Sequence, residues 1–203
     1  MNEPDKGKRS KGTRRRGDLL ENAILQAAWE EWRETGYTAL TMEAIAIRAG
    51  TNKNALYRRW PNKTKLVLAA IIKLIPKPSL DVPDTGDLRE DVLILLNRIA
   101  ETMQLIGAET IHGIMADYYD KDIIAYLPQM IGNKSEDQLT MLIRAILENA
   151  EKRGEVALDR LHERVVSLPG DLLRYELFTT HEPLSKQTMI EIVDDIFLPL
   201  VRI

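Results

Sequence analysis

The sequence predicts an all-α protein with a small N-terminal domain and a larger C-terminal domain. Apolar residues recur at helical spacing along most of the chain, and glycine, proline or capping residues separate these segments at helical lengths. Prolines cluster in a boundary loop near residues 76–86. We therefore expect a disordered basic arm over residues 1–17, a helical domain over 18–75 and a second helical domain over 76–203.

The composition excludes several classes of protein. No cysteine is present among the 203 residues, so no disulfide or thiolate metal site is available. The charged N-terminus does not resemble a signal peptide, and no apolar run approaches the roughly 18 residues of a membrane span. We expect a soluble, cytoplasmic protein with no membrane partner and no cofactor.

Catalytic and metal-binding motifs are also missing from the sequence. His112, His162 and His181 lie far apart without the spacing of metal ligands, and there is no HExxH pair and no phosphate-cradling glycine loop. We expect no metal site and no enzyme activity. An enzyme or a stand-alone ligand carrier remains an alternative, because an active site assembled only in three dimensions leaves no motif.

Charge is distributed unevenly between the two expected domains. Residues 1–75 contain fifteen Lys and Arg against eight Asp and Glu, a net charge of +7, whereas residues 76–203 contain thirteen against twenty-three, a net charge of −10. A basic domain on an acidic body directs a polyanion to one end of the molecule. Membrane binding would need a basic helix with large apolar side chains on its free face, which this end lacks.

The first helix is expected from Gly17 and Asp18 to Thr35, with Gly36 ending it. Its function is to support the two short helices that follow. Its apolar side carries Leu20, Ile24, Ala28 and Trp32.

Two short helices with a glycine between them form the most informative segment. Thr41 is a good N-cap for the first of them, and Gly50 is the residue best able to take a positive φ at its end. Asn52 can cap the next helix, so that helix should begin at Lys53 and continue to Trp60. A turn this short makes the two helices cross steeply, as in a helix-turn-helix motif.

The second of these helices has one narrow apolar side. At about 100° per residue, Leu56 and Trp60 lie within about 40° of each other and form the buried side. Lysine, asparagine, tyrosine and arginine cover most of the remaining surface, and these groups contact phosphate oxygens and base edges. The segment is therefore a candidate recognition helix, and an ordinary solvated face is the alternative.

These residues resemble the N-terminal domain of the TetR family of bacterial transcriptional regulators, over roughly residues 18–70. The matching positions are Gly36-Tyr37, Thr41-Met42-Glu43-Ala44-Ile45-Ala46, Ala49-Gly50, Leu56-Tyr57-Arg58-Arg59-Trp60-Pro61-Asn62-Lys63 and Leu66. The resemblance implies that Tyr57 and Lys63 hold phosphates and that Lys53 and Asn54 meet the major groove. Asn52, Asn54 and Ala55 stand where Ser, Gly and Thr are common, so the base preference of a relative does not transfer.

The basic arm extends the candidate DNA-binding surface. Seven Lys and Arg occur between residues 6 and 16, and such a run cannot fold alone. It can lie along phosphates or enter the minor groove, and the alternative is a solubilising tail. The full set of candidate DNA-binding residues is Arg14, Arg15, Arg16, Thr41, Thr51, Asn52, Lys53, Asn54, Tyr57, Arg58, Arg59 and Lys63.

Helices are expected through the remainder of the chain. Asn62 can cap a fourth helix that ends near Ile75. Pro169-Gly170 lies inside an otherwise regular apolar rhythm and predicts a kink. The expected helices of the C-terminal domain cover residues 87–107, 109–120, 122–130, 135–153, 159–180 and 185–200.

The last helix presents an apolar arc of about 160°, which is wider than one packing partner needs. A homodimer formed by a four-helix bundle, the usual dimer of the TetR family, would cover the excess. It would also space two recognition helices about 34–36 Å apart on a palindromic operator. The alternative is burial against the chain's own core. Candidate interface residues are Leu161, Val165, Leu168, Leu172, Met189, Val193, Ile196 and Phe197.

The resemblance further implies a small lipophilic ligand held among the central helices. The expected function is a repressor that the ligand releases from its operator, and the alternative is a DNA-binding regulator without a small-molecule inducer. Each candidate lining residue is also a plausible core residue. These candidates are Met103, Met115, Tyr118, Tyr119, Met141 and Phe178.

Overall fold

A computed structural model describes residues 10–76, 79–118, 138–180 and 184–202. The chain divides into two compact units, residues 1–75 and 76–203. Within the ranges given, the regular structure is helical, and the only β pairing is an isolated antiparallel bridge between Val156 and Arg202. The predicted all-α fold is confirmed.

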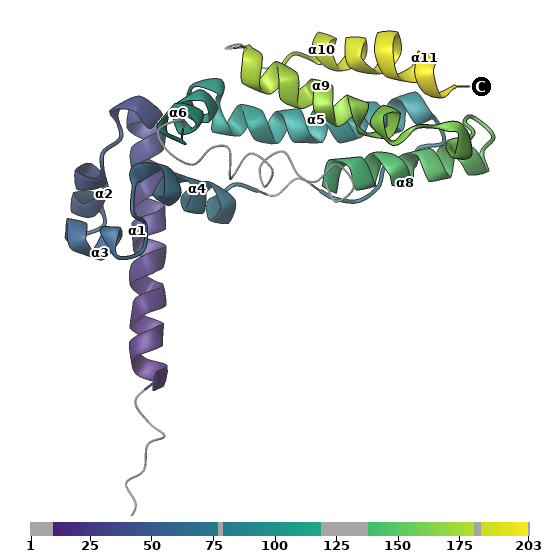
Figure 1. Cartoon of the computed structure of the whole chain (residues 1–203). Helices are drawn as coiled ribbons and strands as arrows, with labels where there is room; N and C mark the ends of the chain where they lie inside the picture. The colour runs from purple at the N-terminus through teal and green to yellow at the C-terminus, as the bar shows by residue number, and fades with distance from the viewer. Residues whose placement is uncertain (1–9, 77–78, 119–137, 181–183, 203) are drawn as a thin grey trace, which may run out of the picture. The chain divides into compact units, whose positions relative to one another are not determined.

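The N-terminal unit is built on one long helix (Figure 1). This helix is interrupted at Gly36, whose φ of 76° and ψ of 169° suit a residue without a Cβ atom. The short helices α2 and α3 follow it, and the last helix of the unit packs along the first. The four helices are α1 (Ser10–Ala39), α2 (Met42–Arg48), α3 (Lys53–Tyr57) and α4 (Lys63–Leu74).

The core of the N-terminal unit contains the side of α1 that the sequence predicts, together with the inner sides of the other three helices. Ile24 and Leu56 are fully buried, and the Tyr37 hydroxyl lies 2.9 Å from the Thr64 hydroxyl inside this core. Burying each large apolar side chain stabilises the fold by about 1.5–3 kcal/mol. Helix α2 is thereby fixed against α1 and α3 against α2, although neither short helix is long enough to be stable alone.

The C-terminal unit is a bundle in which α5, α8 and α9 pack against one another, and the final helical run packs on α5 and α9 (Figure 1). Pro169 lies inside α9, and the final run from Lys186 changes from α to π and back to α helix. The elements are α5 (Leu88–Ile106), α6 (Ala108–Tyr118), α8 (Gln138–Lys152), the 3₁₀ helix η1 (Leu158–Arg160), α9 (Glu163–Thr179), α10 (Lys186–Ile190), the π-helix η2 (Glu191–Phe197) and α11 (Leu198–Val201).

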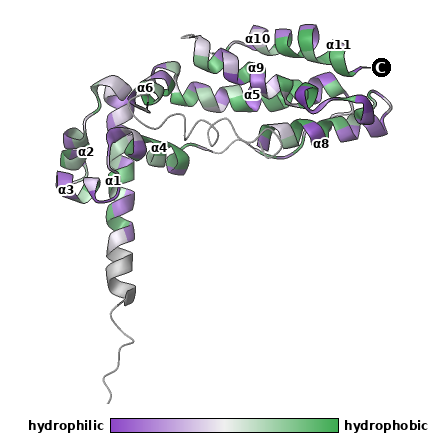
Figure 2. Cartoon of the chain, in the orientation of Figure 1, coloured by the Kyte–Doolittle hydropathy of each residue, from purple (hydrophilic) through white to green (hydrophobic). Residues whose placement is uncertain are grey.

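Apolar side chains from α5, α8, α9 and η2 form one core in the C-terminal unit. Figure 2 shows that apolar colours are frequent along α5, whereas polar colours gather at the end of α8 that leads into the following loop. Leu96, Ile146 and Val193 have no exposed surface, and each comes from a different element. The core therefore depends on several elements together, as expected for helices whose stability comes from packing.

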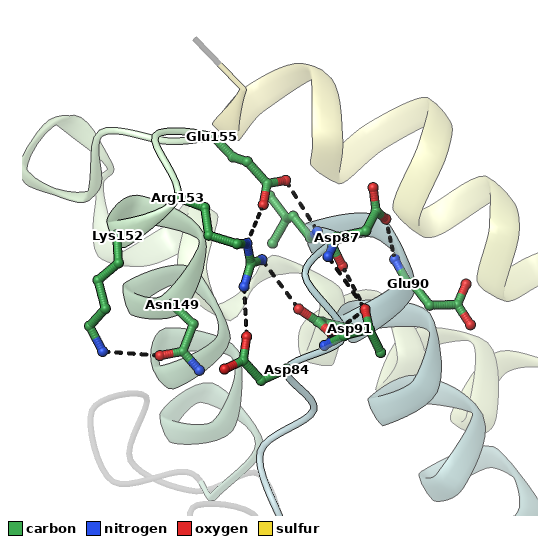
Figure 3. Close-up of polar contacts among 10 residues, drawn as sticks. Asp84, Asp87, Glu90, Asp91, Asn149, Lys152, Arg153 and Glu155 are labelled. Atoms are coloured by element: carbon green, nitrogen blue, oxygen red, sulfur yellow. Dashed lines mark hydrogen bonds and ion pairs between the residues drawn. The ribbon is translucent and has the colours of Figure 1, made fainter.

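A polar cluster joins the loop before α5 to the end of α8 (Figure 3). The Arg153 guanidinium reaches Asp84 at 2.7 Å, Glu155 at 2.6 Å and the fully buried Asp91 at 3.3 Å. Thr85 also donates to Asp91 from its backbone N–H at 2.6 Å and from its hydroxyl at 2.8 Å. The buried carboxylate thus has both a counter-charge and hydrogen bonds, which its desolvation requires.

The observed helices differ from the predicted ones at several ends. The sequence predicts a disordered arm to residue 17, but α1 already begins at Ser10. Lys and Arg have favourable helix propensities, and extending an existing helix adds one backbone hydrogen bond for each residue that becomes ordered. Helix α3 ends at Tyr57 instead of Trp60. The kinked helix begins at Glu163 after a separate 3₁₀ turn. Residues 1–9 of the arm and the predicted helix over 122–130 lie outside the described residues.

None of the helices in the described ranges combines the length and apolar character needed to cross a bilayer.

Candidate nucleic-acid interface

The turn between α2 and α3 is held by local hydrogen bonds. The Thr41 hydroxyl accepts from the Ala44 N–H at 3.1 Å, and the Asn52 side chain accepts from the Ala55 N–H at 3.0 Å. Gly50 has a φ of 63°, in the left-handed region where a Cβ is costly. Helix α3 therefore begins at Lys53, three residues after Gly50, at a position that the sequence motif determines.

An ion-pair network fixes α2 to α1. The Arg48 Nε lies 2.7 Å from the Glu31 carboxylate, and the same guanidinium also contacts Glu34 and, at 3.8 Å, Glu30. The bond from Arg48 lowers the pKa of Glu34 and raises that of Arg48. Such multiple pairing is more selective in geometry than a single surface ion pair. The network holds α2 at a defined position from which α3 projects.

The exposed side of α3 forms a shallow polar hollow. Helix α3 is largely hydrophilic in Figure 2, and its buried residues are Ala55 and Leu56. Tyr57 keeps 48% of its surface exposed, although it is a large aromatic residue. This surface carries amide, phenol and guanidinium groups, which suit phosphates and base edges. The hollow is lined by Asn52, Asn54, Ala55, Tyr57 and Arg58.

Lys53 is held on one side of this hollow by an acidic residue of α2. Its ammonium lies 2.5 Å from the Glu43 carboxylate, and both side chains are exposed. The hydrogen bond that Lys53 donates to Glu43 raises the pKa of Lys53. Lys53 does not line the hollow, whereas Asn54 does. Of the two residues that the TetR resemblance assigns to the major groove, Lys53 is therefore bound to Glu43 in the free protein, whereas Asn54 faces the hollow.

Lys63 is the first residue of α4 and lies against Tyr37. Its ammonium is 4.4 Å from the centre of the Tyr37 ring and donates to the Tyr37 carbonyl at 3.1 Å. The Asn62 side chain caps the same helix by accepting from the Lys65 N–H at 2.9 Å. A cation–π contact and a cap together place this positive charge at the start of α4.

The other predicted DNA-binding residues lie outside the hollow. Arg59 is turned toward α1, where it contacts the Gly17 carbonyl at 3.4 Å and the Glu21 carboxylate at 3.8 Å. Thr41 is exposed but uses its hydroxyl as a cap, and Thr51 is half-buried. Arg14, Arg15 and Arg16 belong to the first two turns of α1.

Comparison with known proteins identifies the family. Residues 24–70 match the family described as "Bacterial regulatory proteins, tetR family", and residues 82–196 match "Tetracyclin repressor-like, C-terminal domain". The chain belongs to the TetR family. Members of the TetR family are transcriptional regulators that bind DNA and act as dimers, so the predicted family is confirmed.

Individual relatives extend this TetR likeness over nearly the whole chain. An uncharacterized HTH-type transcriptional regulator from Mycobacterium tuberculosis is 31% identical over 179 residues, which cover 88% of this chain and 86% of the relative. A DNA-binding transcriptional repressor from Mycobacteroides abscessus is 27% identical over 187 residues, or 92% of this chain and 96% of that protein. The solved structure of a TetR transcription regulator from Haloarcula marismortui has the same fold, with a TM-score of 0.60 and 17% identity, over 91% of this chain and 100% of that one.

The C-terminal unit of this TetR protein contains an apolar cavity of about 340 Å³ between α5, α8 and α9. A second cavity of about 300 Å³ adjoins it, because Met103 and Leu177 line both. Volumes of this size fall at the lower end of small-molecule pockets. Residues that line the first cavity include Leu95, Ile99, Met103, Leu142, Leu173 and Phe178, with Gln138 and Arg174 as polar groups.

The structure divides the predicted ligand-binding residues into three groups. Met103 and Phe178 line the cavity. Met141 and Met115 border neither cavity. Met141 is 59% exposed, and α8 lines the first cavity with Leu139 and Leu142 instead. Met115 lies on α6. The side chain of Tyr118 and the whole of Tyr119 lie outside the described residues.

The residues predicted to form the dimer interface differ in their burial within the single chain. Met189, Val193 and Phe197 are at most 1% exposed and belong to the core of their own unit, which corrects their assignment to a surface between chains. The π-helix bonds each residue to the fifth along, so a wheel drawn at 100° per residue misplaces the faces there. Ile196 stays 39% exposed. Partly buried residues of the same prediction are Leu161, Val165, Leu168 and Leu172.

Leu200 belongs to the apolar arc predicted for the last helix, and it is 51% exposed. Sequence reasoning missed two features of these sites. Tyr175 of α9 is 61% exposed, and only its aromatic character on a helix with an apolar face indicated it. The pairing of Glu43 with Lys53 joins two separate helices and has no sequence signal.

Proposed function

We propose that this protein is a homodimeric, sequence-specific DNA-binding regulator that acts as a repressor. The observation that carries the proposal is the exposed polar hollow of α3, whose lining begins at the cap residue Asn52 directly after the helix-turn-helix hinge. Asn54 and Arg58 provide amide and guanidinium groups for base edges, and Tyr57 and Lys63 provide donors for phosphates. The net charge of +7 over residues 1–75 supplies the electrostatic attraction.

Dimerisation is proposed through the outer sides of α9 and the final helical run. Ile196, Leu200 and Tyr175 are exposed there although they are apolar or aromatic, and a second chain would cover them. Two recognition helices related by a two-fold axis can then contact successive major grooves of a palindrome.

Selection from a pool of random duplexes tests DNA recognition directly. The purified protein should enrich a palindromic sequence, and its affinity for the enriched duplex should fall with salt at a log–log slope of about −0.9 for each neutralised phosphate. A protein that enriches no sequence and ignores duplexes in dilute salt would contradict the proposal.

We further propose that a lipophilic ligand in the α5–α8–α9 cavity releases the protein from its operator. The apolar lining and the cavity volume of about 340 Å³ support a ligand of small-molecule size. Release requires that the ligand prefer the conformation that does not fit the operator, because equal affinity for both conformations shifts nothing.

A cavity-filling variant separates the ligand-responsive repressor from a regulator without an inducer. Ile99→Phe should reduce binding of the fluorescent probe 8-anilinonaphthalene-1-sulfonate while leaving operator affinity unchanged, since Ile99 lines the cavity in the C-terminal unit. Lipophiles that displace the probe should weaken operator binding of the unaltered protein only. If no displacing compound changes operator affinity, the alternative without an inducer is favoured.

A further inference from the structure

The α2–α3 pair places opposite charges beside the surface proposed to bind DNA. Glu43 lies in the first turn of α2, and Lys53 is the first residue of α3. Their side chains meet at 2.5 Å, with 65% of Glu43 and 45% of Lys53 exposed. The Lys53 ammonium is therefore engaged with a carboxylate in the free protein, at the edge of the surface where phosphates would arrive.

The backbone around this ion pair is held firmly. Each of the two helices begins at a side-chain cap, and the Thr51 N–H donates to the Ala46 carbonyl at 2.9 Å across the hinge. The distance between the starts of α2 and α3 is thus set by the motif itself. Because the backbone is already fixed, only the two side chains lose freedom when the ion pair forms. The bond to Glu43 raises the pKa of Lys53, so the ammonium stays charged while it is paired.

Arg58 offers a comparison on the same surface. It lines the polar hollow and is exposed, and within the described part of the chain no carboxylate lies in salt-bridge range of it. Arg58 can therefore meet any phosphate without first losing a partner. Lys53 must exchange Glu43 for a DNA group, and a phosphate offers little over the carboxylate it replaces, since both interactions are exposed ion pairs.

We propose that Glu43 is a specificity-determining residue that keeps Lys53 from contacting phosphates on non-target DNA. This inference rests on the proposed DNA-binding function. On a non-target duplex Lys53 stays with Glu43 and adds no contact. On the target, a base edge that accepts two hydrogen bonds, such as guanine O6 and N7, contributes more than an exposed ion pair does, so Lys53 leaves the carboxylate for it. Glu43 thus lowers binding to wrong sequences more than binding to the right one.

The test measures affinity for a random-sequence duplex pool and for the duplex selected from it, with the full-length protein between about 50 and 200 mM salt. The variants are Glu43→Gln, Lys53→Gln and the double variant. Glu30→Gln is the matched control: it removes the same charge from the same unit, but Glu30 lies near Arg48, which Glu31 and Glu34 still hold.

Glu43→Gln should strengthen binding to the random pool by up to about eightfold at 0.1 M salt and steepen its salt slope by about 0.9, which corresponds to one additional phosphate contact. Affinity for the selected duplex should rise by a smaller factor, so the ratio of the two affinities falls. In the Lys53→Gln background the same substitution should do no more than Glu30→Gln. An unfolded variant would bind DNA more weakly, so stronger binding by Glu43→Gln also shows that this variant is folded.

Three results would overturn the inference: equal gains on the random and selected duplexes, equal effects of Glu43→Gln and Glu30→Gln, or a gain that persists without Lys53. Failure of the unaltered protein to bind any duplex at low salt is a separate result, which would contradict the proposed function itself.

Discussion

At the scale of single residues, the surface proposed to bind DNA contains cations that differ in their partners within the protein. Lys53 is paired with Glu43, Arg59 is turned toward α1, and Lys63 lies on the Tyr37 ring. Arg58 and Asn54 line the polar hollow. Charge alone therefore does not distinguish these side chains. The neighbours of each group within the protein do.

Lys63 and Asn54 should respond differently to substitution. Lys63→Met removes a phosphate donor and should weaken binding to all duplexes, with a salt slope flatter by about 0.9. Asn54→Ala removes a base-edge donor and acceptor and should reduce discrimination at particular bases by about 1–3 kcal/mol. Anisotropy titrations on the selected duplex and on its single-base variants provide the measurement. Identical behaviour of the two variants would contradict the assigned roles.

At the scale of elements, polar links hold helices that are distant in sequence. Arg153 joins the loop before α5 to the end of α8 (Figure 3). Arg89 on α5 binds the Asp194 carboxylate of η2 through two hydrogen bonds of 2.6 and 2.8 Å. The first link contains a buried carboxylate, whereas the second is partly exposed. Their contributions to stability should differ accordingly, because removing one partner of a buried charge leaves the other uncompensated.

The buried link should be the more sensitive of the polar contacts to mutation. Arg153→Gln leaves the fully buried Asp91 without a counter-charge and should lower the free energy of unfolding by about 3 kcal/mol. Asp84→Asn is the control, since Asp84 is 57% exposed and its loss should change stability by less than about 1 kcal/mol. Urea unfolding followed by circular dichroism measures both. Similar values for the two variants would contradict a special role for Asp91.

The Arg89–Asp194 pair should affect stability in acid. The bond from Arg89 lowers the pKa of Asp194 below its ordinary value of 3.8, so the folded protein binds this proton less readily than the unfolded chain does. The stabilisation is present above about pH 4 and is lost as the pH falls through the folded pKa. Asp194→Asn should therefore flatten the decline of stability below pH 4, with an effect under about 1 kcal/mol. Arg89→Gln should also flatten it, but by less, because Arg202 still lowers the pKa of Asp194. An unchanged dependence on acid pH in both variants would exclude the pair.

At the scale of the whole molecule, the two units carry opposite net charges and different proposed functions. The N-terminal unit presents the polar surface of α3, and the C-terminal unit contains the cavity and the exposed apolar residues of its last helices. Binding to a palindrome needs two copies of the first, which the second is proposed to bring together. Dimerisation and operator affinity should therefore change together.

Leu200→Glu tests this dependence. Leu200 is 51% exposed in the single chain, so the substitution should preserve the fold but place a charge in the proposed interface. We expect the dimer dissociation constant to rise at least about tenfold, or 1.4 kcal/mol, in sedimentation experiments. Affinity for the palindrome should fall with it. Met141→Glu, at a residue 59% exposed on α8, is the control that should change neither.

The sequence by itself determined the local features of this protein. Thr41, Gly50, Asn52 and Asn62 act at the predicted ends of α2, α3 and α4, because each cap involves residues within four positions of one another. The apolar periods likewise predict an all-α fold, and the resemblance predicts the TetR family.

Tertiary structure decided the features that depend on distant residues. The Glu43–Lys53 pair, the contact of Lys63 with Tyr37 and the cavity around Met103 each join different elements. Val193 is buried in its own unit and lies in a π-helix, whose faces a regular 3.6-residue wheel does not represent. A helical period specifies which residues share a side, but only packing specifies what that side meets, because contact energies depend on neighbours far away in the chain.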